Sequence, residues 1–171
     1  MNDHSITMND PYMTTIEDER FLREAIQLAR EGMNSNQGGP FGCVIVRDGE
    51  IVGKGCNRVT STNDPTAHAE VVAIRDACQN LDSFQLDGCT LYASCEPCPM
   101  CLGAIYWARP SRIVYAAEHT DAADAGFDDS FIYKELEKKH EERHIPMQQL
   151  LRNEAGQVFR EWVALEKRMP Y

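Results

Sequence analysis

Three cysteines recur at every third position of the stretch "SCEPCPMC", residues 94–101: Cys95, Cys98 and Cys101. Cysteine thiolates are common zinc ligands, and zinc in proteins prefers four ligands in a tetrahedron. Three thiolates and one histidine would close the tetrahedron and make the site structural. Two thiolates and one histidine would leave the fourth position open to water, and the site could then catalyse hydrolysis. The function of the chain depends on which of these sites forms.

A histidine ligand is available in the stretch "TAHAEVV", where His68 stands at the predicted start of a helix. A histidine in such a place is more often a helix-cap or surface residue than a ligand. Glu70 changes that interpretation, because it lies in the same first turn and can present its carboxylate to the same point. We therefore expect His68 to bind metal and Glu70 to transfer protons. The other histidines occur in segments typical of a tail, an acidic loop and a charged helix: His4, His119, His140 and His144.

Pro97 separates Cys95 from the other two cysteines. Cys98 and Cys101 are expected one turn apart at the start of a helix, so that their side chains share one face, and the helix N-terminus favours their thiolate forms. Cys95 is predicted to end the preceding strand, and a continuous helix cannot pass through the proline to bring it to that face. The expected ligand set is His68, Cys98 and Cys101, with one zinc ion per chain. A closed site that includes Cys95, and buried thiols without metal, remain the alternatives.

These residues are positioned by a predicted alternation of helices and strands. The expected core elements are a helix at 16–31, hairpin strands at 41–47 and 51–57, a helix at 66–80, a strand at 89–95, a helix at 98–109 and a strand at 112–117. The later expected elements are an acidic loop at 118–130, a charged helix at 133–143, an edge strand at 145–151 and a helix at 154–168 with Val158, Phe159, Trp162 and Leu165 facing inward. A strand, a helix and a strand in this order predict a parallel pair of strands.

This order of elements predicts an α/β fold, a three-layer α/β/α sandwich around a mixed five-stranded sheet. Thr15 and Asp18 form the pattern of a capping box for the first helix, Gly32 is expected to end it, and Asp48–Gly49 is the predicted hairpin turn. No repeat or shift in composition marks a second domain. Residues 1–171 are therefore expected to form one domain, with a flexible tail at 1–14 and a C-terminal helix and tail at 152–171.

Composition limits the classes of function. Of the 171 residues 43% are hydrophobic, yet no apolar run is long enough to predict a transmembrane helix. The first residues are polar and do not resemble a secretory signal, and seven cysteines is an odd number, so we expect the reducing cytoplasm. The formal net charge of −10 would repel phosphate backbones. We therefore expect neither a nucleic-acid partner nor a membrane.

The two motifs together, "HAE" at 68–70 and "PCPMC" at 97–101, match the pattern H-x-E…P-C-x-x-C of zinc-dependent nucleobase deaminases. Over residues 17–117 the chain resembles proteins of the cytidine deaminase-like fold. The stretches "GGPFG", "GCNRV", "DPTAHAEVVAIR" and "YAAEHTDAADAGFDDSFIYKE" resemble bacterial guanine deaminases in particular. That likeness extends past the catalytic motifs to the final tyrosine.

The resemblance implies hydrolytic deamination of guanine to xanthine and ammonia in purine catabolism or salvage. In the implied reaction a zinc-activated water attacks C2 of guanine, and Glu70 moves the protons without binding the metal. The resemblance also implies that Asn57 binds the polar edge of the purine and that Asp129, rather than Asp128, reaches the amino group. Without the family pattern, Asn57 would be interpreted as a turn residue and Asp129 as one of many solvated acids.

Further pocket residues follow from the same resemblance: Ala69, Phe41, Trp107 and Tyr171. Phe41 and Trp107 would supply flat apolar walls for the base, although aromatic residues in such positions are more often part of a core. Tyr171 would cover the pocket, often that of the partner subunit, in a homodimer that exchanges C-terminal segments.

Two other functions fit the same motifs. The same mechanism could deaminate a nucleoside such as guanosine, or adenosine in tRNA, although a net charge of −10 argues against a tRNA partner. A zinc-stapled binding module without turnover is the alternative from a different class. It would require Cys95 as a fourth ligand, or a Glu70 that points away from the metal.

Overall fold

The computed structural model describes residues 14–171, and the chain divides after Asp129 into two compact units. The predicted flexible tail at 1–14 lies, except for its last residue, outside the described residues. The first unit contains a sheet with covering helices, and the second unit, Ser130–Tyr171, is helical. No helix among residues 14–171 is long and apolar enough to cross a membrane.

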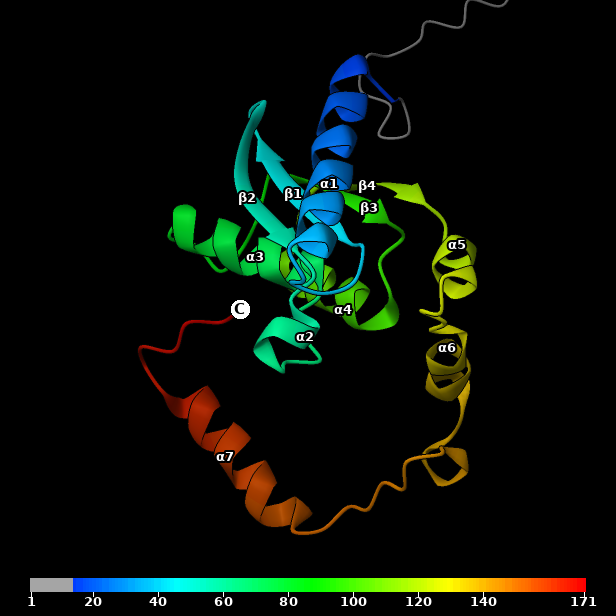
Figure 1. Ribbon diagram of the computed structural model, residues 1–171. Helices are drawn as coiled ribbons and strands as arrows, with labels where there is room; N and C mark the ends of the chain where they lie inside the picture. The colour runs from blue at the N-terminus through cyan, green and yellow to red at the C-terminus, as the bar shows by residue number, and fades with distance from the viewer. Residues whose placement is uncertain (1–13) are drawn as a thin grey trace, which may run out of the picture. The chain divides into compact units, whose positions relative to one another are not determined.

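A mixed sheet of four strands forms the centre of the first unit (Figure 1). Its strands are β1 Gly42–Arg47, β2 Glu50–Cys56, β3 Thr90–Cys95 and β4 Arg112–Ala117. They lie in the order β2-β1-β3-β4, with β1 antiparallel to β2 and β3, and with β3 parallel to β4. The predicted parallel pair and the mixed α/β sheet are confirmed.

The predicted fifth strand at 145–151 is wrong, because this segment forms no strand. Pro146 has no N–H group to donate to a ladder. Leu151 has a positive φ of 54° just before the last helix, which is incompatible with an extended strand. Within the described residues the sheet therefore has four strands rather than five.

The helices that cover the sheet are α1 Ile16–Asn34, α3 Ala69–Asn80 and α4 Pro99–Ala108. Side chains of β1 alternate between the two faces, as strand geometry requires. Val44 and Val46 pack in the same core cluster as Phe21 of α1, whereas Cys43 and Ile45 pack with residues of α3 and α4. The first unit thus has the predicted three layers (Figure 1).

Two glycines of β2 let α3 lie directly on the sheet. A Cβ atom added to Gly55 would be 2.2 Å from the carbonyl oxygen of Ala69, and one added to Gly53 would be 2.6 Å from that of Ala73. A larger side chain at either position would displace the helix. These glycines therefore help to fix where the segment "HAE" begins.

The hairpin between β1 and β2 turns at Asp48–Gly49, as predicted. Both residues have positive φ, 52° and 79° respectively, which a type I′ turn requires. A short helix, α2 Val59–Thr62, follows β2.

The first helix starts with the predicted capping box. The hydroxyl of Thr15 accepts a bond from the N–H of Asp18 at 3.1 Å, and the Asp18 carboxylate accepts one from the N–H of Thr15 at 2.7 Å. The predicted end at Gly32 is wrong, because α1 continues to Asn34. A Cβ atom on Gly32 would lie 2.8 Å from that of Cys56, so this glycine serves close packing rather than helix termination.

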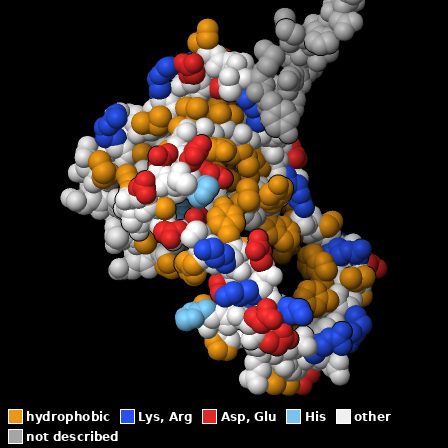
Figure 2. Space-filling view, turned by 90° about the vertical axis from the view of Figure 1, so that its right-hand side faces the viewer, with side chains coloured by type: hydrophobic (Ala, Val, Ile, Leu, Met, Phe, Trp, Pro, Cys, Tyr) orange, Lys and Arg blue, Asp and Glu red, His pale blue; other side chains and the backbone are white. Residues whose placement is uncertain are grey.

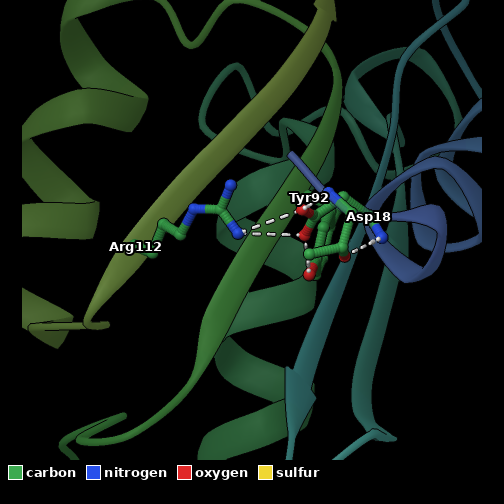
Figure 3. Close-up of polar contacts among 4 residues, drawn as sticks. Asp18, Tyr92 and Arg112 are labelled. Carbon is green, nitrogen blue, oxygen red and sulfur yellow. Dashed lines mark hydrogen bonds and ion pairs between the residues drawn. The ribbon is translucent and has the colours of Figure 1, made fainter. Parts of the chain in front are cut away.

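A buried carboxylate joins α1 to the sheet (Figure 3). Asp18 is 3% exposed, and its Oδ1 atom accepts bonds from the Tyr92 hydroxyl of β3 at 2.7 Å and from Arg112 of β4 at 3.0 Å. Burial by itself would raise the pKa of Asp18, but the bonds from Tyr92 and Thr15 and the charge of Arg112 hold that pKa below its usual value. The network therefore ties one helix to two strands.

The segment predicted to be an acidic loop, 118–130, contains a short helix, α5 His119–Asp124. Glu118 and Asp121 form a capping box at its start, so two of the acids stabilise a helix end rather than lying in a loop. The loop prediction is wrong for this half of the segment. Residues 125–129 are irregular, as expected.

The second unit consists of α6 Ser130–Glu137, a 3₁₀ helix at His140–Glu142 and α7 Arg152–Ala164. None of its residues is buried. The side chains predicted to face inward, three in α7 and one just after it, are 41–72% exposed: Val158, Phe159, Trp162 and Leu165. That prediction is wrong for the chain as described, because an apolar helix stripe is buried only where a second surface covers it.

Candidate active site

Two helix starts bring three metal-ligating side chains together. His68 is the N-cap of α3, Cys98 is the N-cap of α4, and Cys101 lies in the first turn of α4. The Nδ1 atom of His68 is 3.5 Å from the Sγ atom of Cys98 and 3.5 Å from that of Cys101. The ligand atoms of the three residues all lie within 4.8 Å of one another.

These separations fit a tetrahedral zinc ion. Zinc–sulfur and zinc–nitrogen bonds of about 2.3 and 2.05 Å at tetrahedral angles place a thiolate sulfur about 3.6 Å from an imidazole nitrogen. The observed 3.5 Å agrees with that value. Neither Cys95 nor Glu70 belongs to the group. The described residues thus offer three ligands, which is the number that a catalytic zinc site uses.

Cys95 makes a different contact. It is the last residue of β3, and its thiol donates to the carbonyl oxygen of Glu118 at 3.5 Å. Burial raises the pKa of Cys95 to about 11, so the group remains a protonated thiol near neutral pH. A closed site with Cys95 as the fourth ligand would require the bond to Glu118 to break.

Hydrogen bonds among His68, Cys98 and Cys101 shift the pKa values of all three side chains. A hydrogen bond from Cys101 lowers the pKa of Cys98 to about 4, and His68 adds to this effect. The same bond, with burial, raises the pKa of Cys101. The bond to Cys98 also raises the pKa of His68. Metal ligands must be deprotonated to bind, and the lowered pKa of Cys98 favours the thiolate that this requires.

Glu70 is buried next to the ligands. It lies in the first turn of α3 and is 8% exposed. Burial raises the pKa of Glu70, and a hydrogen bond with Cys101 acts in the opposite direction. A buried carboxylate that is close to metal ligands without being one of them is suited to accept and return a proton.

A cavity of about 230 Å³ adjoins these residues. Six of the residues singled out from the sequence line it: Phe41, Asn57, His68, Glu70, Cys98 and Asp129. The structure therefore brings two of the three expected metal ligands, the expected proton carrier and three residues expected to contact the substrate to one space.

Asn57 is held by the backbone around it. The side chain is 5% exposed, and its Oδ1 atom accepts bonds from the N–H groups of Gly39 at 3.1 Å and Val59 at 3.2 Å. A Cβ atom on Gly38 would lie 2.2 Å from this oxygen, so the absence of a side chain at Gly38 makes room for the Asn57 amide. With Oδ1 engaged, the amide nitrogen is the part of Asn57 that can donate to a ligand in the cavity.

Asp129 lies in the irregular segment after α5 and is partly buried, whereas Asp128 is exposed. Burial raises the pKa of Asp129, and the negative charge of Cys98 adds to the rise. The charge of His119 acts in the opposite direction and lowers it. The carboxylate is thus within electrostatic reach of both the metal ligands and α5.

The sequence did not predict every residue of the cavity, and three with side chains suited to binding or positioning stand out: Glu96, His119 and Phe127. The ring of Phe127 packs edge-to-face on that of Phe41, with centroids 5.0 Å apart and an angle of 86°. A usable signal existed for the other two. Glu96 follows β3 and His119 comes soon after β4, and the carboxyl ends of neighbouring parallel strands meet at one edge of a sheet.

The remaining predicted pocket residues occupy other environments. Ala69 is 1% exposed at the start of α3. Trp107, near the end of α4, is 64% exposed and is not among the described residues that line this cavity. Tyr171 is 70% exposed in the second unit. Their substrate-binding roles stay predictions.

The sequence matches a known family over most of the first unit. Residues 15–117 match the profile described as the cytidine and deoxycytidylate deaminase zinc-binding region. The chain therefore belongs to this family of zinc-binding deaminases. Within it, the chain is 64% identical to the guanine deaminase of Bacillus subtilis (strain 168) over 144 residues, which are 84% of this chain and 92% of that protein.

Solved structures agree with this relationship. The crystal structure of guanine deaminase from Bacillus subtilis superimposes with a TM-score of 0.87 and 61% identity, covering 90% of this chain and 98% of that one. A tRNA-specific adenosine deaminase of Aquifex aeolicus is 40% identical over 99 residues, 58% of this chain and 65% of that protein. The likeness to the guanine deaminase is thus both closer and longer.

Proposed function

We propose that the protein catalyses the hydrolytic deamination of guanine to xanthine and ammonia. The observation that carries the proposal is the 64% identity over 144 residues to the guanine deaminase of Bacillus subtilis. The cavity supports it, because Glu70, Asn57 and Asp129 line the same space as two of the metal-ligating residues.

In this proposal His68, Cys98 and Cys101 hold one zinc ion per chain. When bound, zinc acts as a Lewis acid that lowers the pKa of water to about 7. Glu70 takes one proton from the attacking water on its carboxylate and passes it to a ring nitrogen of the base. It then takes the second water proton, from the hydroxyl now bonded to C2, and passes it to the amine, so that the C2–N bond breaks, ammonia leaves and the C2 carbonyl of xanthine forms. Because Glu70 is only 8% exposed, bulk water has little access to the proton that it carries.

The polar groups of the cavity suit the edges of guanine. O6 and N7 of guanine are acceptors and its N2 amino group is a donor. The amide nitrogen of Asn57 can donate to an acceptor of the base, and the carboxylate of Asp129 can accept from the amino group. Phe41 and Phe127 supply apolar walls, while Ala69 would contact the bound base near the metal.

An assay of ammonia release tests the proposal. Zinc-loaded protein is incubated separately with guanine, guanosine, adenine and cytosine, and the Glu70→Gln variant serves as a control for contaminating deaminases. We expect ammonia and an equal amount of xanthine from guanine. Absence of ammonia from guanine would refute the proposal, and faster release from guanosine would assign a nucleoside substrate instead.

A second candidate is deamination of adenosine in tRNA. The 40% identity to the Aquifex aeolicus enzyme favours it, whereas the net charge of −10 opposes it, because binding to a phosphate backbone depends on Lys and Arg. Adding an unmodified tRNA to the same assay and measuring inosine tests this candidate. Inosine at a rate comparable with that of guanine turnover would favour it over free guanine.

We further propose that the chain is one deaminase domain whose C-terminal segment is exchanged in a homodimer. The exposed apolar stripe of α7, with side chains 41–72% exposed, supports a second copy as the covering surface. Tyr171, which ends the chain, would then cover the partner's pocket, and Trp107 would contact the base from a neighbouring wall. The seven free cysteines suit a reducing compartment, so the cytoplasm is the proposed location.

Light scattering and a deletion test the dimer. The full chain should have the mass of two copies, and deletion of residues 152–171 should reduce assembly. Deletion of 169–171 alone should leave zinc and assembly intact and strongly reduce turnover of guanine. A monomeric full chain would refute the dimer, and full activity after the short deletion would remove Tyr171 from the pocket.

A further inference from the structure

One side-chain pair at the cavity has no part in the chemistry described so far. The carboxylate of Glu96 accepts a bond from the imidazole of His119 at 2.9 Å, between Oε2 and Nδ1. The same oxygen lies 3.3 Å from the backbone nitrogen of His119 and accepts from its N–H group. Both residues line the cavity. The single oxygen thus fixes the position of the His119 backbone and the orientation of its ring.

The pair joins two segments that diverge after the sheet. The parallel pairing of β3 and β4 ends with Cys95 opposite Ala117, and the N–H of Glu96 still donates to the carbonyl oxygen of Ala117 at 2.9 Å. Beyond this point one segment leads to the metal ligand Cys98. The other leads through α5 to Phe127 and Asp129. The bond between Glu96 and His119 therefore connects residues 96–98, the metal-binding loop, to α5 and to residues 125–129, the Asp129 segment.

Because the pair is partly exposed, we expect it to matter for the geometry of the site more than for the stability of the fold. The side chains of His119 and Glu96 are 52% and 31% exposed, and such ion pairs add little to the free energy of folding. Their effect on geometry can be much larger, because a displacement of about 1 Å in an active site can cost about 10²-fold in rate. Glu96, His119 and Asp129 line the same cavity.

We propose that Glu96 and His119 are positioning residues, which hold α5 and the Asp129 segment in register with the metal-binding loop. The inference rests on the proposed deamination of guanine, in which Asp129 meets the amino group that is replaced. Neither residue touches the reacting atoms in this scheme. Their loss should lower kcat, because Asp129 then meets the developing transition state in the wrong place, while KM changes less.

Four variants of the zinc-loaded full chain separate the contributions. Glu96→Ala and His119→Ala remove the bond, whereas Glu96→Gln keeps an acceptor and His119→Asn keeps a donor near the position of Nδ1. We expect the two alanine variants to lose about 10- to 100-fold in kcat on guanine with less than about a threefold change in KM. The two conservative variants should recover most of this loss. Arg23→Ala, which removes an exposed ion pair on α1, is the matched control and should equal the wild type.

Zinc content and amide hydrogen exchange complete the test. All variants should retain one zinc per chain, and residues 118–129 should exchange faster in the alanine variants than in the wild type. Alanine variants with unchanged kcat would overturn the inference while guanine turnover by the wild type upholds the proposed function. If the wild type does not turn over guanine, the proposed function fails. In that case an unchanged rate of amide hydrogen exchange at residues 118–129 in the alanine variants would still overturn the positioning role of Glu96 and His119. A His119→Asn variant as poor as His119→Ala would also overturn it, because Nε2 rather than the bond to Glu96 would then matter.

Discussion

Replacing Asp18 should destabilise the fold without altering the proposed active site. This carboxylate is 3% exposed and accepts hydrogen bonds from the Tyr92 hydroxyl, the Arg112 guanidinium and the N–H of Thr15 at 2.7, 3.0 and 2.7 Å. Asp18→Ala removes the acceptor for all three donors at once (Figure 3). The variant therefore breaks the tie between α1 and two strands.

The expected loss can be worked out from the contacts. Removing one partner of a buried ion pair costs about 3–5 kcal/mol, and loss of a helix cap costs about 1 kcal/mol. The Arg112 side chain is 24% exposed, so water can hydrogen-bond to the guanidinium once the carboxylate is gone. The total loss in the free energy of unfolding should therefore fall near the lower end of this range. We expect about 3 kcal/mol for Asp18→Ala. Asp18→Asn keeps one acceptor oxygen but loses the charge and the second acceptor, so a smaller loss of about 1–2 kcal/mol is expected.

The effect should depend on pH in a defined direction. The pKa of Asp18 is lower in the folded protein than the usual value, which is about 3.9 in unfolded chains. The folded state therefore favours the carboxylate, and its contribution to stability is fully present above the unfolded pKa. It is lost as pH falls through the folded pKa. The difference in stability between wild type and Asp18→Asn should be largest near neutral pH and should shrink below about pH 4.

Urea denaturation at pH 7 and at pH 3.5 measures this difference. Loss of zinc at low pH affects both proteins, so the comparison between them reports on residue 18. Glu19→Gln is the control, because Glu19 forms an exposed pair with Arg23 and should change stability by less than about 1 kcal/mol. Equal destabilisation by Asp18→Asn at both pH values, or none at pH 7, would refute the assigned role of the charge.

Three further predictions concern the metal and the cavity. Cys98→Ser should lose zinc and activity whereas Cys95→Ser keeps both, as metal analysis and the ammonia assay will show; equal behaviour would mean that the ligand assignment is wrong. Glu70→Gln should keep zinc and the fold but lose at least about 10²–10⁴-fold in turnover, because each general acid–base step contributes that much; a rate within tenfold of wild type would exclude Glu70 from proton transfer. Asp129→Ala should reduce kcat on guanine far more than Asp128→Ala, and comparable losses would show that the predicted choice between these acids is wrong.

The grouping of His68, Cys98 and Cys101 could be predicted from local chemistry because their geometry is local. Cys98 and Cys101 are held by one helix start, and Pro97 marks that start in the sequence. His68 comes from a different element, but its helix is placed by the contact of Gly55 with Ala69. Short-range patterns of this kind also predicted the β1–β2 hairpin and the capping box of α1.

Other features depend on contacts that a local pattern does not contain. Residues 119–124 form a helix because Glu118 and Asp121 cap it, although their acidity is typical of a loop. Residues 145–151 contain enough apolar side chains to suggest a strand, but a strand needs a partner with unpaired backbone groups. The α7 stripe was correctly recognised as one face of a helix, whereas its burial depends on a surface that the sequence pattern does not identify.

We expect the reaction and the choice of substrate to be specified by different parts of the chain. The family profile ends at residue 117, so it includes the metal ligands and Glu70 but not Asp129 or Phe127. The metal ligands are built on helix starts over a packed core, whereas Asp129 and Phe127 belong to the irregular segment after α5, most of whose residues are not buried. Such a segment can change without disturbing the sheet. Substitutions within 118–129 should therefore alter which base is accepted before they alter whether zinc is bound, while substitutions around "HAE" and "PCPMC" should abolish the reaction for every substrate.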